Sequence, residues 1–163
     1  MLFRSCKNEN WAVFNHASSW FVLASIMNGD TDFAYEAYSK MLPINSSKNI
    51  DRYEVEPFVF AEYITSPDHK TENQASHSWL TGTAVWMLRI GMDYICGFRT
   101  SLKGIIINPN IPSKWKSFTA ERNFRGKTIK LKVENSKGKY SGIKLIEING
   151  EKVESNFIKL EEF

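Results

Sequence analysis

The spacing of apolar residues changes partway along this 163-residue chain, and no other feature constrains its fold as strongly. Before about residue 98, apolar residues recur every three or four positions, whereas beyond about residue 110 they alternate with polar ones. The first spacing suits one face of an α-helix, and the second suits one face of a β-strand. The sequence therefore predicts an α+β protein, with a helical part at residues 1–98 and a small antiparallel β domain at residues 99–163.

The helical part is expected to contain helices over 20–27, 33–41 and 77–98, a further helix that begins within 54–64, and a polar surface loop at 44–53. Ser18 and Ser19 offer hydroxyl groups to cap the first helix. The apolar run at residues 79–98 approaches membrane-spanning length, but Arg89 and Asp93 interrupt it. This favours a buried helix of a soluble protein over a membrane span.

The β domain is expected to hold about five short antiparallel strands, in a small sandwich or half jelly roll. Apolar residues at 129, 131 and 133 alternate with two lysines and a glutamate, which predicts a half-buried strand. Residues 142–148 predict another strand. Asn149-Gly150 follows it directly and is a strong signal for a tight hairpin turn.

Composition excludes several classes of protein. With 42% hydrophobic residues, the chain can bury a core, so disorder is not expected. Residues 99–163 carry 14 basic and 7 acidic side chains, against 7 basic and 11 acidic in residues 1–98. Because the lysines alternate along strands, they indicate a solvated face and no nucleic-acid partner. Cys6 and Cys96 show no disulfide or metal-ligand spacing, and Met1–Lys7 does not resemble a secretion signal, so a cytoplasmic protein is expected.

Two groups of residues are candidates for a functional site, one for acid/base catalysis and one for anion binding. Glu54, Glu56, Glu62 and Asp68 are acid/base candidates, because paired carboxylates break glycosidic bonds, although solvated loop charges or helix-capping groups are the simpler explanation. His16 precedes a predicted helix and offers an imidazole to an anion or to a neighbouring carbonyl. Thr81-Gly82-Thr83 lets an anion approach backbone N–H groups without a Cβ in the way, although a packing glycine is the alternative.

Four blocks of the sequence resemble glycoside hydrolase family 94, which contains the cellobiose, cellodextrin and chitobiose phosphorylases. They occur in the family's order: Glu9-Asn10 followed by 13–17 (VFNHA), then 56–63 (EPFVFAEY), 78–87 (SWLTGTAVWM) and 108–115 (NPNIPSKW). The resemblance covers residues 9 to about 135. It implies that residues 1–98 are the last helices of an (α/α)6 barrel and that residues 99–163 are a jelly-roll-type domain.

The same resemblance implies a reaction. In the family, inorganic phosphate attacks the anomeric carbon of a β-linked disaccharide or oligosaccharide while an aspartic acid protonates the leaving oxygen, which gives a sugar 1-phosphate of inverted configuration. Phosphate is a co-substrate, and no cofactor or metal is implied. The partners are thus the sugar and phosphate, with no nucleic acid and no membrane, and a homodimer is expected of the full-length enzyme.

Site residues follow from the resemblance position by position. His16, Thr81 and Gly82 match phosphate-binding positions, and Glu9 and Glu62 match sugar-contacting positions. Glu62 stands where better-known members have a glutamine, and Asn8 stands where the family has a lysine. The family's catalytic aspartate precedes the first block, so no catalytic residue is expected in this chain.

The sequence leaves two other functions open. One is a catalytically inactive carbohydrate-binding or assembly module that completes another chain. The other is a hydrolase that uses Glu54 or Glu56 as its acid. The expected function is the C-terminal part of an inverting glycoside phosphorylase that holds part of the phosphate and sugar site.

Overall fold

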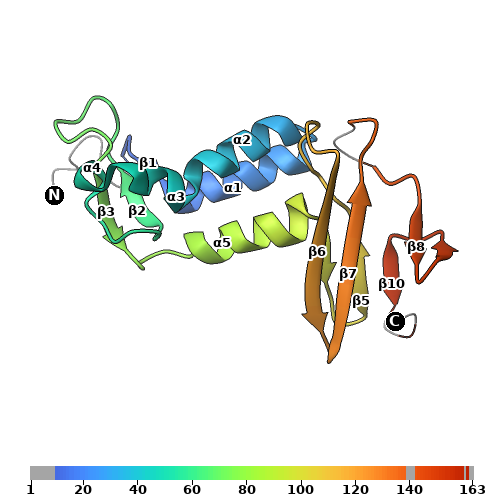
Figure 1. Cartoon of the computed structure of the whole chain (residues 1–163). Coiled ribbons are helices and arrows are strands. Elements are labelled where there is room, and N and C mark those ends of the chain that lie inside the picture. The colour runs from blue at the N-terminus through green and yellow to red at the C-terminus, as the bar shows by residue number, and fades with distance from the viewer. Residues whose placement is uncertain (1–9, 139–141, 160, 162–163) are drawn as a thin grey trace. The chain divides into compact units, whose positions relative to one another are not determined.

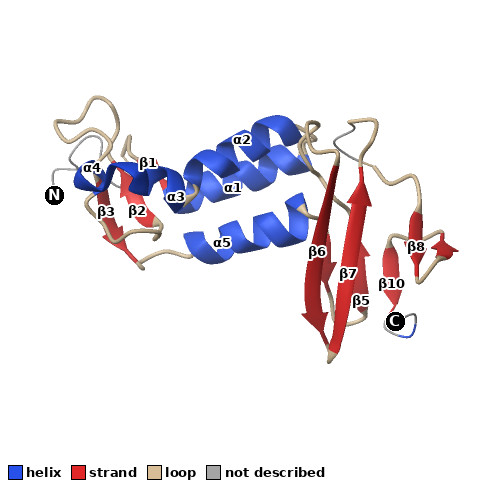
Figure 2. Cartoon of the chain, in the orientation of Figure 1, coloured by secondary structure: helices blue, strands red, loops and turns tan. Residues whose placement is uncertain are grey.

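The computed structural model describes residues 10–138, 142–159 and 161 (Figure 1). It contains helices and antiparallel strands, so the predicted α+β class is correct (Figure 2). The elements are, in chain order, β1 (Val13–Phe14), α1 (Asn15–Met27), α2 (Thr31–Met41), α3 (Pro43–Ser46), η1 (Ser47–Asn49), α4 (Ile50–Tyr53), β2 (Ala61–Ile64), β3 (Ala75–Ser78), α5 (Thr83–Arg89), the π-helix η2 (Ile90–Ile95), β4 (Phe98–Thr100), β5 (Gly104–Ile107), β6 (Ser117–Phe124), β7 (Lys127–Glu134), β8 (Ile146–Ile148), β9 (Glu151–Val153) and β10 (Phe157–Lys159).

The chain divides into two compact units that alternate along the sequence. Unit 1 comprises the residues up to 24 together with 36–88, and unit 2 comprises 25–35 together with the residues from 89 onward. The domain border expected between residues 98 and 99 stays a prediction.

In unit 1, a three-stranded antiparallel sheet brings together segments that are far apart in the sequence. Its strand order is β1-β2-β3, with Phe14 opposite Tyr63 and Tyr63 opposite Ser76. The buried side chain of Asn15 donates a hydrogen bond to the Ala61 carbonyl over 2.8 Å. This bond holds the first residue of α1 beside the first residue of β2, so the start of α1 has a fixed place next to the sheet.

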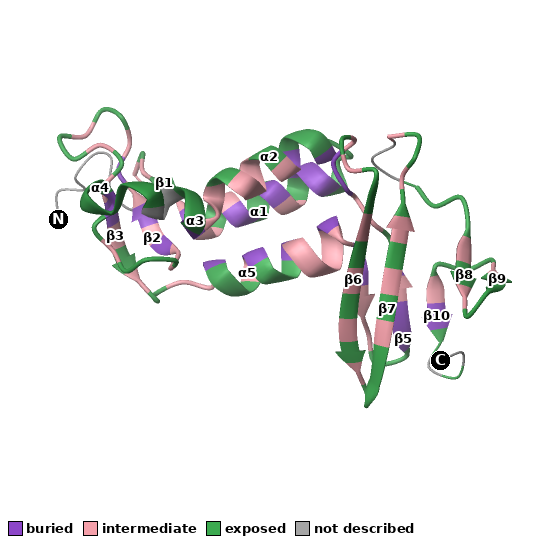
Figure 3. Cartoon of the chain, in the orientation of Figure 1, coloured by how far each residue is buried: buried purple, intermediate pink, exposed green. Residues whose placement is uncertain are grey.

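In unit 2, the core forms around the antiparallel sheet β10-β5-β4. Phe98, Ile105, Ile107 and Ile158 are buried there, and apolar residues of the β6–β7 hairpin pack against them. Half-buried and exposed residues alternate along β6, as Figure 3 shows. The alternation predicted around residues 129–133 is thus confirmed in β7, whose solvent face carries the lysines.

The loop from α1 to α2 is closed by backbone hydrogen bonds. Asp30 N donates to Ser25 O and Gly29 N donates to Ile26 O, each over 3.0 Å, and Gly29 has φ 89°. This is the Schellman pattern that ends a helix, and glycine adopts its left-handed conformation without strain.

Within unit 2, Ser113 donates to both carboxylate oxygens of Asp32 through its backbone N and its hydroxyl, each over 2.7 Å, and the Tyr35 ring packs on Trp115.

Two glycines of unit 2 allow the backbone to pass very close to them. A Cβ on Gly97 would lie 2.1 Å from the carbonyl carbon of Asn108, and one on Gly104 would lie 2.1 Å from Ile158 O. Gly97 also has φ 66°. Only glycine therefore fits at position 97, beside the backbone of Asn108, and at position 104, beside the backbone of Ile158.

Several predicted elements differ from the observed ones. The helix expected within 54–64 is wrong: Glu54 and Phe58 have positive φ, which interrupts helical geometry, and Ala61–Ile64 pairs as β2. The helix expected from residue 77 begins at Thr83, because residues 75–78 pair with β2. Ser18 and Ser19 do not cap α1, which begins at Asn15; their hydroxyls donate instead to the carbonyls of Phe14 and His16.

Other differences concern the extent of elements. The polar loop expected at 44–53 contains the short helices α3, η1 and α4. The strand expected at 142–148 is limited to residues 146–148, although the hairpin turn at Asn149-Gly150 is confirmed between β8 and β9. Residues 98–159 hold seven strands in their described part, rather than about five. No helix among the described residues is long and apolar enough to cross a membrane.

Candidate functional site

His16 and Gly82 lie against each other in unit 1. A Cβ built on Gly82 would stand 3.3 Å from His16 Cε1 and 3.6 Å from His16 Nε2. His16 is in the first turn of α1, and Gly82 directly precedes α5, so the starts of two helices meet at this point. The structure thus brings together two of the three predicted phosphate-binding residues, which are 66 positions apart in the sequence.

The imidazole of His16 has an unused polar atom. Its Nε2 is buried and has no hydrogen-bond partner among the described residues. Buried polar atoms in folded proteins nearly always have partners, because an unmade hydrogen bond costs about 1–3 kcal/mol. A buried imidazole nitrogen without a partner beside a glycine suits a site that receives a further group.

Thr81 contacts the beginning of α5. Its Oγ1 lies 2.6 Å from the Oγ1 of buried Thr83 and accepts a 3.4 Å hydrogen bond from Thr83 N. The hydroxyl therefore helps to cap α5 in this structure. The approach of the Thr81 side chain to His16 stays a prediction.

The Glu62 carboxylate lies beside a histidine of the neighbouring strand. Its Oε2 lies 3.4 Å from Nδ1 of His77, which occupies the neighbouring strand β3, and His77 Nδ1 also lies 2.8 Å from Ser76 Oγ. The Glu62 side chain is only 20% exposed. In its protonated form, His77 would offset the negative charge of this carboxylate.

Glu56 lies near the loop that joins β3 to α5. A hydrogen bond from the Ser78 side chain lowers the pKa of the Glu56 carboxyl from its ordinary value, with smaller contributions from its own backbone and from Trp79. A lowered pKa keeps this carboxyl ionised, which opposes the role of a general acid. Glu54 is hydrogen-bonded to Gln74 Nε2, and Asp68 lies in the turn after β2. Glu9 lies outside the described residues.

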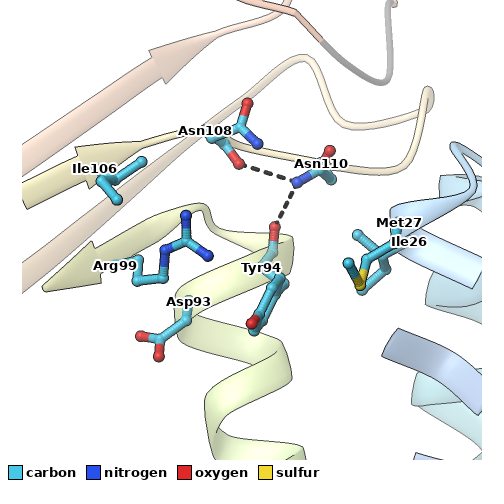
Figure 4. A pocket seen from close by; sticks show the side chains of 8 residues that line it. All are labelled: Ile26, Met27, Asp93, Tyr94, Arg99, Ile106, Asn108 and Asn110. Atoms are coloured by element: carbon cyan, nitrogen blue, oxygen red, sulfur yellow. Dashed lines mark hydrogen bonds between the residues drawn. The ribbon is translucent and has the colours of Figure 1, made fainter. Parts of the chain in front are cut away.

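Unit 2 contains a pocket of about 240 Å³ that holds none of the predicted site residues (Figure 4). Asp93, Tyr94, Arg99 and Asn110 are among its lining residues. The Asn110 amide donates to the carbonyls of Tyr94 and Asn108, each over 3.0 Å. Asp93 is paired with Arg122 over 3.0 Å, so the polar groups of this pocket mainly join η2 to the β domain.

Sequence reasoning did not identify His77, Trp20 or Trp86 as neighbours of the site. Trp20 and Trp86 each follow a site residue by four positions, His16 and Gly82 respectively, so helical spacing alone would have placed them on the same faces. His77 required the pairing of β2 with β3, which the sequence did not predict because residues 54–64 were assigned to a helix.

Comparisons with known proteins identify the family of the chain. The sequence model of the glycosyl hydrolase 94 superfamily catalytic domain matches residues 1–97. The chain is 34% identical over 147 residues to the N,N'-diacetylchitobiose phosphorylase of Vibrio furnissii, a match that covers 90% of this chain and 18% of that protein. It is 30% identical over 145 residues to the solabiose phosphorylase of Paenibacillus borealis, covering 89% of this chain and 19% of that protein.

A third relative is the 3-O-beta-D-glucopyranosyl-beta-D-glucuronide phosphorylase of Paenibacillus borealis, 31% identical over 144 residues, with 88% of this chain and 19% of that protein covered. The chain thus spans less than a fifth of the length of these relatives. All three are glycoside phosphorylases by name. The family match over more than half of its residues shows that this chain belongs to the glycosyl hydrolase 94 superfamily.

Proposed function

We propose that this chain supplies part of the phosphate site of an inverting glycoside phosphorylase, which cleaves a β-linked disaccharide or oligosaccharide with inorganic phosphate to give a sugar 1-phosphate. The observation that carries the proposal is the buried, unpartnered Nε2 of His16 beside Gly82. Hydrogen bonds to a charged acceptor are stronger than those between neutral groups, so a phosphate oxygen is a favourable partner for this nitrogen. Gly82 leaves room for the imidazole itself, because a Cβ at this position would lie 3.3 Å from His16 Cε1.

The sugar side of the proposed site involves Glu62 and Glu9. The Glu62 carboxylate accepts hydrogen bonds from sugar hydroxyl groups, and a protonated His77, 3.4 Å away, would reduce the repulsion between this carboxylate and the phosphate. In this proposal, the catalytic aspartate comes from residues outside this chain, so the 163 residues alone carry no phosphorolysis. No cofactor takes part.

The proposed context is a longer enzyme. Its helices would form an (α/α)6 barrel that includes residues 1–98, and residues 99–163 would form a jelly-roll-type domain beside it. A homodimer in the cytoplasm is proposed, as for the family. The greater length of the proposed enzyme is supported by relatives that are about five times as long as the matched region.

A chimera with a relative tests the proposal. The 147 matched residues of the Vibrio furnissii phosphorylase are replaced by those of this chain, and phosphorolysis of N,N'-diacetylchitobiose is followed. We expect the chimera to release a sugar 1-phosphate, whereas this chain alone releases none. A folded chimera that binds the disaccharide without cleaving it would instead favour a carbohydrate-binding or assembly module.

Variants of the chimera locate the phosphate. His16→Ala removes a charge-assisted hydrogen bond of about 1.5–3 kcal/mol, and we expect it to raise the KM for phosphate by about 10-fold or more while changing the KM for the disaccharide less. Gly82→Ala is expected to act in the same direction, because its Cβ would press on the imidazole at 3.3 Å. Glu151→Ala, at an exposed polar position of β9, is the control. Equal effects on both substrates would contradict the assignment.

A further inference from the structure

The imidazole of His16 is in contact with an aromatic ring of its own helix. The ring of Trp20, one helical turn later, meets it edge to face, with ring centroids 4.7 Å apart and an interplanar angle of 61°. Trp20 in turn meets Trp86 of α5 edge to face at 6.3 Å and 83°. Trp86 Cδ1 would lie 3.7 Å from a Cβ on Gly82.

The imidazole, the two tryptophan rings and Gly82 are each next to two of the others. Trp20 follows His16 by four residues on α1, and Trp86 follows Gly82 by four residues on α5. Each tryptophan therefore lies on the same helix face as one member of the His16–Gly82 contact. The two tryptophans contact each other, so the positions of imidazole and glycine are linked through both helices.

A free imidazole ring turns about its last side-chain torsion, because that torsion is broad and roughly two-fold. A turn of the His16 ring would move Nε2 away from Gly82. The edge-to-face contact with Trp20 opposes such a turn, because aromatic pairs prefer this arrangement and lose attraction when the rings rotate. No hydrogen bond among the described residues holds Nε2, so ring packing has to do so.

We propose that Trp20 is a positioning residue for the anion site: it fixes the plane of the His16 imidazole so that the unpartnered Nε2 stays beside Gly82. Trp86 supports Trp20 from α5. The inference deepens the proposed phosphate site and rests on it, but the orientation of the ring can be measured in the absence of phosphate.

Modification of histidines by diethyl pyrocarbonate tests the inference on the 163-residue chain itself. The reagent acylates accessible, uncharged imidazole nitrogens, and mass spectrometry of peptides resolves the three histidines of this chain. His77, which is 61% exposed, and His69 serve as internal references. In phosphate-free buffer, we expect His16 to react most slowly, because its Nε2 is buried.

Trp20→Leu is expected to increase the modification rate of His16 by about 2- to 10-fold, which corresponds to the loss of one aromatic pair. The rates of His69 and His77 should not change, and Trp20→Phe should restore slow modification of His16. Glu151→Ala, at an exposed position of β9, is again the control. An increase at all three histidines would indicate general loosening, and an unchanged His16 rate in a folded Trp20→Leu variant would overturn the inference.

Inorganic phosphate separates this inference from the proposed function. This arm uses the chimera with the Vibrio furnissii phosphorylase, because this chain alone supplies only part of the proposed site. With phosphate present, His16 of the chimera should become more protected, and Trp20→Leu in the chimera should weaken that protection. If Trp20→Leu changes the basal rate but phosphate protects neither protein, the proposed phosphate site fails and the positioning of the ring by Trp20 stands. If phosphate protects both proteins equally, Trp20 has no role in the site.

Discussion

Two carboxylates near the candidate site each have a neighbour on the same short strand. Glu56 and Glu62 belong to the same sequence block; the Ser78 side chain lowers the pKa of the Glu56 carboxyl, and Glu62 lies 3.4 Å from His77. Both partners come from β3. One short strand therefore supplies a neighbour to both carboxylates. The sequence did not predict these neighbours, because residues 54–64 were expected to be helical.

Ser78→Ala should make the stability of the protein less dependent on Glu56. A carboxyl whose pKa is lowered in the folded state stabilises the fold above its unfolded pKa, and this contribution is lost as the pH falls through its folded pKa. We therefore expect Ser78→Ala to lower the free energy of unfolding at neutral pH, and the difference from the unaltered protein to shrink as the pH falls through the acidic range in which the folded Glu56 protonates.

Urea unfolding at a series of pH values measures this difference. Glu56→Gln provides the control background, because a neutral amide has no titration to couple to Ser78. If the effect of Ser78→Ala on the free energy of unfolding is constant with pH, or persists unchanged in the Glu56→Gln background, Ser78 acts through another contact.

Elements with a local signal were predicted well. The alternation of residues 129–133 corresponds to β7, and the Asn149-Gly150 turn corresponds to the β8–β9 hairpin. A half-buried strand and a tight turn each depend mainly on residues adjacent in the sequence. Helix α2 also lies close to its expected range. Elements that depend on distant partners were missed: β2 and β3 exist because they pair with each other and with β1.

The candidate site shows the same limit. The resemblance named His16 and Gly82, and the structure places them in contact. Helical spacing could have indicated Trp20, but whether its ring meets the imidazole depends on packing between α1 and α5. The partner of Glu62 depends on the register of β2 against β3, which periodicity alone does not fix.

Two glycine substitutions should differ sharply in their cost. Gly150 has φ 90° with open space around it, so Gly150→Ala adds only the strain of the left-handed conformation, about 1–2 kcal/mol. Gly97→Ala adds a similar strain, and its Cβ would also overlap the backbone of Asn108 at 2.1 Å. We expect Gly97→Ala to prevent folding of unit 2, or to destabilise it far more than Gly150→Ala. Thermal unfolding followed by circular dichroism measures both; similar midpoints would contradict the close approach at Gly97.

The chain as a whole leaves much apolar surface uncovered. Helix α1 carries no charged side chain, and Trp20 and Phe21 are more than half exposed. On α5, Val85 and Leu88 are 64% and 66% exposed. A helix that is apolar on most of its faces is usually buried on most of them. Contiguous apolar surface of this kind usually marks a place where other protein packs.

We expect the isolated chain to self-associate for this reason. Analytical ultracentrifugation over a range of concentrations should show oligomers, and Phe21→Glu combined with Leu88→Lys should reduce them. The matched control is a pair of opposite charge changes at exposed positions of the β6–β7 hairpin, Ser117→Lys with Thr128→Glu. A monodisperse monomer at all concentrations, with a cooperative unfolding transition, would contradict this expectation.

The alternation of the two units along the chain has a consequence for gene recombination. Unit 2 takes residues 25–35 from within the region that the family match covers and the rest from residue 89 onward. A crossover with a related gene near residue 98 would therefore combine one parent's Asp32 and Tyr35 with another parent's Ser113 and Trp115. Parents that differ at these four positions would yield mismatched hybrids, so viable exchanges should inherit residues 25–35 and 89–159 from the same ancestor.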